Sequence, residues 1–271
     1  MYNRFAFEEI PVLVGITRAI SPAIGRCELT HLARAPIDIE KARAQHHAYE
    51  GILRGLGIRV ESLPAEPELP DSVFVEDAAV VLDECAVITR PGAASRQPET
   101  ESIARALEPY RKLFWIVPPA TLDGGDVMSV GRTVYVGLGL RSNQAAIRQL
   151  QEILGPYDYR VAGVSVRGCL HLKSAVTLAA ANTLLLNPAW AKANDFPGFR
   201  FIEVDPSEPC AANGLLIGES VVFPAAFPKT RSRIEAAGIR TVAVDVSELA
   251  KAEGAVTCCS LIFRDSPRPE R

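Results

Sequence analysis

The chain has 271 residues, 48% of them hydrophobic, and is long enough to bury a large core within one domain. Its formal net charge of −3 is spread over both signs without a basic block, which argues against nucleic acid as a partner. No apolar run reaches the length of a membrane span, and the N-terminus carries two acids where a signal peptide needs an apolar core. The six cysteines show no framework spacing, so we expect reduced thiols in a soluble, cytoplasmic protein.

The first part of the chain predicts a strand, a long helix and a second strand. Residues 12–16 form a short apolar run, and Asp38 is a suitable N-cap for a helix over about 39–56. Gly57 ends that helix, because glycine is a poor helix former. Residues 58–63 alternate as a half-buried strand does.

A pattern of polar loop, strand, tight turn and second strand then recurs along the chain. Small polar residues that open the copies are 49, 48, 39 and 47 residues apart, and such periods indicate a repeat architecture. We therefore predict one α/β domain over 1–271, built from five strand–strand–helix–strand units, with the N-terminal segment completing one unit and 264–271 forming a loose tail. The predicted elements are strands at 78–82 and 86–89, a helix at 99–107 and a strand at 113–117; strands at 127–130 and 134–136 and a helix at 142–154; strands at 176–179 and 184–186; strands at 215–217 and 221–223; and a last strand that carries Cys258 and Cys259.

The loops that lead into the first strand of each copy carry most of the reactive side chains. In a closed ring of repeats these loops meet at one end of the central axis. A thiolate nucleophile needs a depressed pKa or a nearby base, and paired carboxylates suit a guanidinium. We therefore predict a site in which sulfur attacks a small cation. The side chains concerned are Asp71, Glu76, Asp77, Asp123, Asp126, His171, Asn213 and Cys258.

Each of these residues also has an ordinary structural interpretation. Cys258 and Cys259 would point to opposite faces of a regular strand, so at most one faces the site, and spacing does not say which. His46 and His47 lie on the first helix, where exposure to solvent is the default, whereas the position of His171 at the start of a copy favours a functional role.

Six motifs together resemble the dimethylarginine dimethylaminohydrolase family. The resemblance extends from about residue 18 to residue 263, and its specificity comes from the order and spacing of the motifs rather than from any one of them. The motifs are FVED at 74–77, ITRPG at 88–92, LDGGD at 122–126, HLKS at 171–174, AAN at 211–213 and TCCS at 257–260.

This resemblance implies a five-bladed α/β propeller of the pentein type that hydrolyses Nω-methylated arginine to citrulline and an alkylamine, with no cofactor and no metal. It implies Cys258 as nucleophile, His171 as general acid and base, and Asp123 as the acid that orients His171. Cys259 is then a packing residue. The implied substrate-binding positions are Glu76 and Asp77 at the guanidinium, Asp71 and Leu29 along the substrate, Arg96 and Arg141 at the α-carboxylate, and the backbone carbonyl of Ala252 at the α-amino group.

Three alternatives to this function stay open at the level of sequence. Arginine or another small guanidine could be the substrate. The chain could be a non-catalytic propeller that binds a partner, although the thiol, the imidazole and the acidic loops argue against that. Zinc could bind adventitiously at the thiol, but the closed ligand sets of structural zinc are absent from the sequence. A small-molecule substrate is the expected partner, and the oligomeric state is left between monomer and homodimer.

Overall fold

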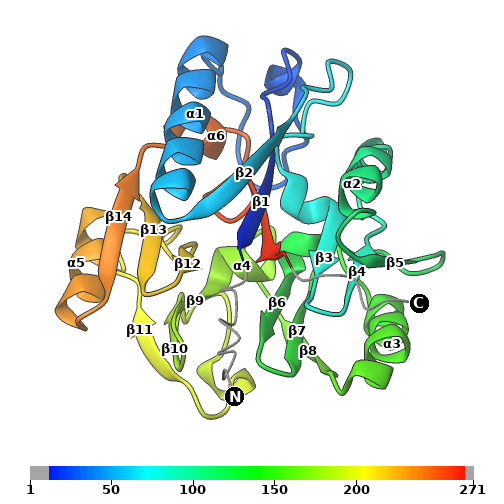
Figure 1. Ribbon diagram of the computed structural model, residues 1–271. Helices are drawn as coiled ribbons and strands as arrows, with labels where there is room; N and C mark the ends of the chain where they lie inside the picture. Colours follow the sequence, from blue (N-terminus) through cyan, green and yellow to red (C-terminus); the bar gives the residue numbers. More distant parts are fainter. Residues whose placement is uncertain (1–11, 266–271) are drawn as a thin grey trace, which may run out of the picture.

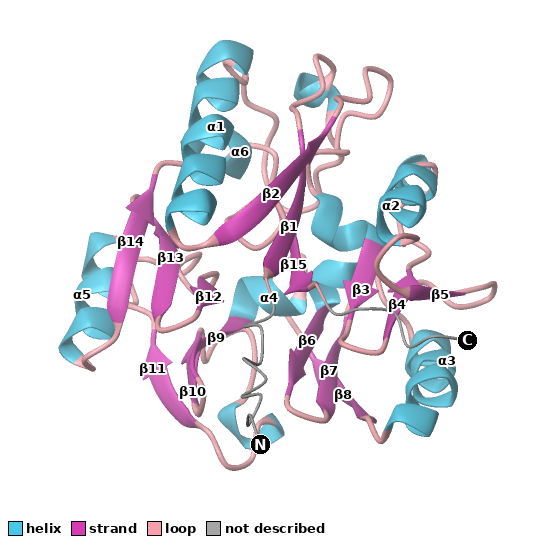
Figure 2. Cartoon of the chain, viewed as in Figure 1, coloured by secondary structure: helices cyan, strands magenta, loops and turns pink. Residues whose placement is uncertain are grey.

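The computed structural model describes residues 12–265, which form five three-stranded sheets arranged around a central axis (Figures 1 and 2). In each sheet the strand nearest the axis runs antiparallel to the middle strand, and the outer strand runs parallel to the middle strand. The predicted five-bladed α/β propeller is therefore confirmed. From the axis outwards the blades are β15 (Leu261–Arg264), β1 (Leu13–Arg18) and β2 (Ile58–Leu63); β3 (Ala79–Val81), β4 (Cys85–Ile88) and β5 (Lys112–Trp115); β6 (Val127–Val130), β7 (Thr133–Leu138) and β8 (Arg160–Ser165); β9 (Val176–Ala180), β10 (Thr183–Leu186) and β11 (Arg200–Glu203); and β12 (Leu215–Ile217), β13 (Ser220–Pro224) and β14 (Arg240–Val244).

Four blades carry a long helix between their second and third strands, on the outer side of the ring (Figure 1). These helices are α1 (Ile39–Gly55), α2 (Glu99–Leu107), α3 (Gln144–Leu154) and α5 (Pro228–Ala236). The blade of β9, β10 and β11 differs from the predicted unit, because its connection contains only the 3-10 turn Ala193–Asp195. Among the described residues, no helix is long and apolar enough to span a membrane.

The helix ends follow from local capping. The Asp38 carboxylate accepts the backbone N–H of Lys41 at 3.0 Å, and Gly57 adopts a positive φ of 87° just after α1. Helix α3 begins two residues later than predicted, because the side chain of Asn143 caps it by accepting the N–H of Ala146 at 3.1 Å. The expectation of exposure is met by His47 and is wrong for His46, which is 4% exposed on the buried face of α1.

The two ends of the chain close the ring within one blade. Strand β15 pairs antiparallel with β1, so that Phe263 lies opposite Val14, as predicted for an N-terminal segment that completes a unit. The predicted loose tail begins too early, because Arg264 is still part of β15 and Asp265 donates its N–H to the carbonyl of Val12 at 2.7 Å. The remainder of that predicted tail, 266–271, lies outside the described residues.

Candidate active site

One end of the propeller axis holds a small pocket that brings together seven of the ten residues to which the family resemblance assigns a role. Three lie outside its lining: Leu29, Glu76 and Asp123. The pocket measures about 20 Å³, which is room for one water molecule. The seven residues that line it are Asp71, Asp77, Arg96, Arg141, His171, Ala252 and Cys258.

Cys258 lies on a turn, whereas the sequence predicts a strand at this position. The turn covers 256–259 and ends before β15 begins at Leu261. The backbone N–H of Glu76 donates to the carbonyl of Cys258 at 3.2 Å, and a side chain at Gly254 would collide with the ring of Phe74. These close contacts fold the apolar run back on itself where an extended strand would otherwise continue.

The turn separates the two neighbouring thiols. Cys258 is half-buried and lines the pocket, whereas Cys259 is fully buried in the core cluster that contains Tyr49 and Phe74. Burial and the negative charges of Glu76 and Asp77 raise the pKa of the Cys258 thiol to about 12. At neutral pH the resting residue is therefore a thiol, and ionisation needs a nearby positive charge.

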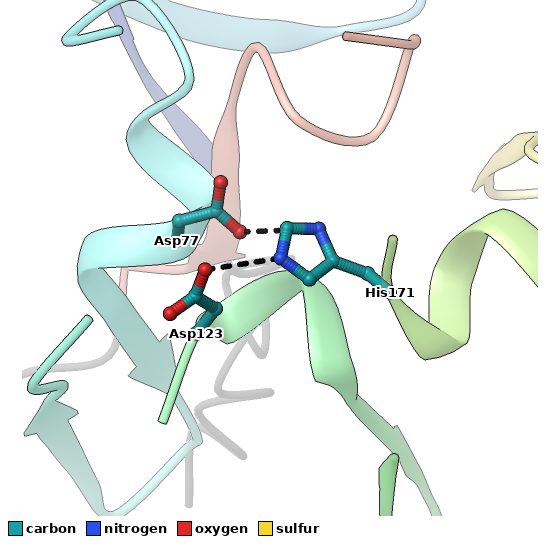
Figure 3. Close-up of side chains that lie close together, drawn as sticks. All are labelled: Asp77, Asp123 and His171. Atoms are coloured by element: carbon teal, nitrogen blue, oxygen red, sulfur yellow. Dashed lines mark hydrogen bonds and ion pairs between the residues drawn. The ribbon is translucent and has the colours of Figure 1, made fainter. Parts of the chain in front are cut away.

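His171 stands between two carboxylates at the start of the short helix α4 (Leu172–Ala175). Its Nε2 lies 3.0 Å from Oδ2 of Asp123, and its Nδ1 lies 3.8 Å from Oδ1 of Asp77 (Figure 3). Burial alone would lower the pKa of His171, but the charges of Asp77 and the hydrogen bond with Asp123 outweigh it and raise that pKa to about 9. The side chain is thus a proton donor at neutral pH.

Asp123 and Asp126 hold the ring of His171 and the start of α4 in place. Asp123 is fully buried, and its second oxygen, Oδ1, accepts the N–H of Gly92 at 2.7 Å. Asp126 accepts the N–H of Leu172 at 2.9 Å and so fixes the first turn of α4. Gly125, one of the two glycines between them, is required for this packing, because a Cβ there would lie 2.6 Å from Nδ1 of His171. The glycines of the LDGGD motif thus admit the close approach of protein groups.

Asp77 and Arg96 form a buried ion pair beside the histidine. Asp77 Oδ2 lies 2.5 Å from Nη1 of Arg96, and Arg96 Nη2 lies 2.8 Å from Glu99. Burial would raise the pKa of Asp77, but His171 and Arg96 lower it to about 2, so Asp77 is a carboxylate. Arg96 also donates to the carbonyls of Asp71 and Phe74, which leaves it less free than predicted for a group that binds a substrate carboxylate.

A segment over 28–32 borders the pocket and is fixed from several sides. Asp71 accepts the N–H of Glu28 at 3.0 Å, and Arg141 donates to the hydroxyl of Thr30 at 3.0 Å. The carboxylate of Glu253 accepts the backbone N–H groups of three consecutive residues, Thr30, His31 and Leu32, at 2.5–3.1 Å. Leu29 lies on this segment and packs, half-buried, against the core cluster under α1.

Glu76 faces away from the pocket, although it was predicted beside a bound guanidinium. It lines a cavity of about 310 Å³ on the axis, which is bordered by the inner strands of the blades. Its carboxylate accepts from Nζ of Lys173 at 2.6 Å and from the hydroxyl of Thr257 at 2.8 Å. The neighbouring acids of the FVED motif thus face different spaces: Glu76 faces the axial cavity and Asp77 faces the pocket. Successive residues of the 3-10 turn Val75–Ala78 point in different directions.

Asp77, Asp123 and His171 could bring three metal-ligand atoms within 4.8 Å of one another. A metal would require the neutral imidazole, whereas His171 is protonated at neutral pH. Asp77 is already paired with Arg96. The chemistry of this donor set therefore fits proton transfer better than metal binding.

Sequence reasoning missed Glu28, Phe74, Leu170, Glu253 and Gly254, which also line the pocket. The sequence gives one weak indication that Glu253 belongs to the site, since this residue stands between Ala252, a predicted site residue, and a glycine. Its positive φ of 59° and its contacts across more than 200 residues of sequence could not be inferred from composition or periodicity.

A five-bladed propeller with a thiol, an imidazole and carboxylates at one end of its axis defines a cysteine-dependent enzyme of the pentein class. The structure superposes on dimethylarginine dimethylaminohydrolase from Pseudomonas aeruginosa, solved as a cysteine-to-serine variant with citrulline, with a TM-score of 0.88, 35% identity, and coverage of 92% of this chain and 98% of that one. The N-terminal domain of ArgZ, an arginine dihydrolase from cyanobacteria, shares the fold at a TM-score of 0.79 and 18% identity, over 94% of this chain and 97% of that one.

Sequence comparison defines the family. Residues 31–177 match the family model for N,N dimethylarginine dimethylhydrolase, eukaryotic. The chain is 37% identical over 236 residues to the dimethylarginine dimethylaminohydrolase of P. aeruginosa, spanning 86% of this chain and 92% of that protein. It is 39% identical over 258 residues to the enzyme of the same name from Streptomyces coelicolor, spanning 94% and 99%. The chain belongs to the dimethylarginine dimethylaminohydrolase family.

Proposed function

We propose that the protein hydrolyses Nω-methylated L-arginine, both the asymmetric dimethyl and the monomethyl form, to L-citrulline and dimethylamine or methylamine. The observation that carries the proposal is the protonated His171 held by Asp123 at the same pocket as the half-buried Cys258. Membership of the family and the citrulline bound to the Pseudomonas relative support this choice of substrate and product.

Charge and hydrogen bonding suggest how the substrate would bind. The Asp77 carboxylate is the natural partner of the guanidinium, because it stays ionised beside His171. Arg141 can exchange its bond with Thr30 for the substrate α-carboxylate, and Arg96, which also lines the pocket, would lie at the same end of the substrate. Asp71, the Leu29 region and the carbonyl of Ala252 would then receive the α-amino end.

The first half of the reaction forms a bond between carbon and sulfur. The positive guanidinium lowers the pKa of Cys258 as it binds, which offsets the carboxylates that hold it near 12. The thiolate attacks the guanidinium carbon to give a tetrahedral adduct. His171 donates its proton to the methylated nitrogen, the carbon–nitrogen bond breaks, and the neutral amine leaves a thiouronium on Cys258.

The second half returns the enzyme to its resting state. His171 is now neutral and accepts a proton from a water molecule as that water attacks the thiouronium carbon. The carbon–sulfur bond breaks, the electron pair returns to sulfur, the hydroxyl proton of the adduct restores the Cys258 thiol, and citrulline is released. Asp123 keeps the imidazole oriented in both steps and stabilises the imidazolium.

Substitution of the two cysteines tests the proposal directly. In Cys258→Ser we expect turnover of asymmetric dimethylarginine to fall by about three orders of magnitude or more, since an alcohol is a far weaker nucleophile than a thiolate. Cys259→Ser is the matched control and should retain most of the activity. The assay measures citrulline and dimethylamine, which should form in equal amounts.

Two outcomes would contradict the proposal. Persistent citrulline formation by Cys258→Ser would remove that residue as nucleophile. A higher kcat/KM for arginine, with ammonia as the second product, would make the protein a deiminase of unmethylated arginine.

The same proposal covers the domain organisation, the cellular location and the oligomeric state of the enzyme. We assign the whole chain, 1–271, to one catalytic domain that acts in the cytoplasm as a monomer or homodimer. All six cysteines are free thiols, which suits a reducing compartment. Size-exclusion chromatography with light scattering would distinguish the two oligomeric states.

A further inference from the structure

The side-chain amide of Asn213 holds the residue that precedes the nucleophile. Its Oδ1 accepts the backbone N–H of Thr257 at 3.1 Å, and its Nδ2 donates to the hydroxyl of the same threonine at 2.9 Å. Asn213 is 3% exposed and lies just before β12. One buried amide thus fixes both the backbone and the side chain of Thr257.

The same amide reaches the helix that follows the catalytic histidine. Nδ2 of Asn213 also donates to the carbonyl of Lys173 at 3.0 Å. Lys173 belongs to α4, whose first residue directly follows His171. Asn213 therefore connects the segment of Cys258 with the segment of His171 through one rigid planar group.

Further bonds extend this connection to all five blades. Thr257 donates to Glu76 at 2.8 Å, and Lys173 donates to Glu76 at 2.6 Å and to the carbonyl of Gly124 at 3.2 Å. Each of the five residues lies in the segment that leads into the inner strand of a different blade. We name this set, Glu76, Gly124, Lys173, Asn213 and Thr257, the axial ring.

The turn of Cys258 depends on such side-chain bonds because it lies outside the sheets. Strand pairing begins only at Leu261, three residues after the nucleophile. Besides Asn213, the turn is held by the hydroxyl of the fully buried Tyr49, which donates to the carbonyl of Val256 at 2.8 Å and lies 2.7 Å from Oγ of Ser260. A displacement of about 1 Å at a reacting atom can cost about two orders of magnitude in rate.

We propose that Asn213 is a positioning residue that fixes the Cys258 sulfur relative to His171 through the axial ring. The inference rests on the proposed roles of Cys258 and His171 in the hydrolysis of methylated arginine. Asn213 does not line the pocket, so its effect reaches the reaction only through Thr257 and Lys173.

The test compares Asn213→Ala with Asn187→Ala. Asn187 is a matched control, since it is 4% exposed, donates to the carbonyl of Pro209 at 2.8 Å, accepts the N–H of Ala189 at 2.9 Å and lies outside both the pocket and the ring. We expect Asn213→Ala to lower kcat for dimethylarginine by about 10- to 100-fold with KM changed less than threefold, because binding groups stay in place while the reacting atoms separate. Asn187→Ala should lower the melting temperature with kcat within twofold of wild type.

A second pair of variants keeps the test usable if Asn213→Ala does not fold. Thr257→Val removes the hydroxyl that the amide holds and keeps the shape of the side chain, whereas Thr257→Ser keeps the hydroxyl. We expect Thr257→Val to lose kcat as Asn213→Ala does, and Thr257→Ser to stay within about threefold of wild type.

Equal kcat values in Asn213→Ala and Asn187→Ala would reduce Asn213 to a structural role and overturn the proposal. If the wild type turns over no methylated arginine, the proposed function fails, and alkylation by iodoacetamide then decides the role of Asn213. In that assay the rate at Cys258 should fall at least fivefold at pH 8 in Asn213→Ala relative to Asn187→Ala, and an unchanged rate would overturn the inference.

Discussion

At the scale of residues, only His171, of the two side chains proposed to react, rests in the protonation state of a preformed thiolate–imidazolium pair, whereas Cys258 rests as a thiol. The pKa of Cys258 is raised to about 12 by burial and by neighbouring acids, and the pKa of His171 is raised to about 9 by Asp77 and Asp123 against burial. Attack needs the thiolate, and departure of the amine needs the imidazolium. The combination of a Cys258 thiolate with a His171 imidazolium is therefore a minor state of the free enzyme, and the substrate cation has to favour it.

This arrangement predicts the pH dependence of kcat/KM. Below about pH 9 His171 is protonated and the thiolate fraction rises tenfold per pH unit, so kcat/KM should rise with a slope near one. Above about pH 9 the gain in thiolate is balanced by the loss of imidazolium, and the profile should level off. Citrulline formation at low substrate concentration between pH 6 and pH 10 measures this.

Asp123→Asn provides the variant for that profile. Removing the charge at Asp123 should lower the pKa of His171 and move the levelling point to lower pH. It should also lower kcat by about two to four orders of magnitude, because the imidazole loses its orienting acceptor. A levelling point that stays near pH 9 in Asp123→Asn would show that another group sets it.

At the scale of elements, the backbone N–H groups of residues 30–32 share a single acceptor from the opposite end of the chain. Glu253 holds three successive N–H groups with one carboxylate while its own backbone has a positive φ of 59°. The pocket in this arrangement measures about 20 Å³, too small for an arginine side chain, so substrate entry requires part of its lining to move. Because Glu253 lines the pocket and holds residues 30–32, we expect it to influence how tightly this border closes around the substrate.

Two substitutions separate the carboxylate of Glu253 from its backbone strain. Glu253→Ala removes the acceptor and keeps the strained φ, whereas Glu253→Gly removes the acceptor and relieves the strain. We expect both to raise KM for dimethylarginine about 5- to 50-fold, and Glu253→Gly to unfold at the higher temperature of the two. Unchanged KM in both variants, measured beside their melting temperatures, would exclude a role for Glu253 in retaining substrate.

The sequence predicts elements well where the signal is local and poorly where distant side chains decide. Asp38 and Gly57 define α1 by capping, so its bounds follow from the residues themselves. The run around Cys258 is apolar and β-prone and predicts a strand, yet Tyr49 and Asn213, remote in sequence, fold it into a turn. The order of the motifs predicts the site residues, but whether each of them faces the pocket or the axial cavity depends on the turn that carries it.

At the scale of the whole molecule, Cys258, the proposed nucleophile, lies three residues before the start of the strand that closes the ring. Strand β15 is the last described strand and joins the first blade beside β1. Its Phe263 packs edge-on against Tyr110 at 5.1 Å and lies under the guanidinium of Arg111, in the neighbouring blade's connection. The stability of this closure and the position of Cys258 should therefore be coupled.

Phe263→Ala tests this coupling, with Phe196→Ala as the matched control. Phe196 is 1% exposed and contacts Tyr135 at the same 5.1 Å, but it lies in the connection between β10 and β11. Each truncation should lower the free energy of unfolding by about 3–5 kcal/mol, because each leaves a cavity of similar size. In urea titrations we expect Phe263→Ala to lose activity at a lower concentration than its circular dichroism signal, since β15 can open before the other blades unfold. Phe196→Ala should lose both signals together, and coincident transitions in Phe263→Ala as well would mean that the ring opens only when the entire propeller unfolds.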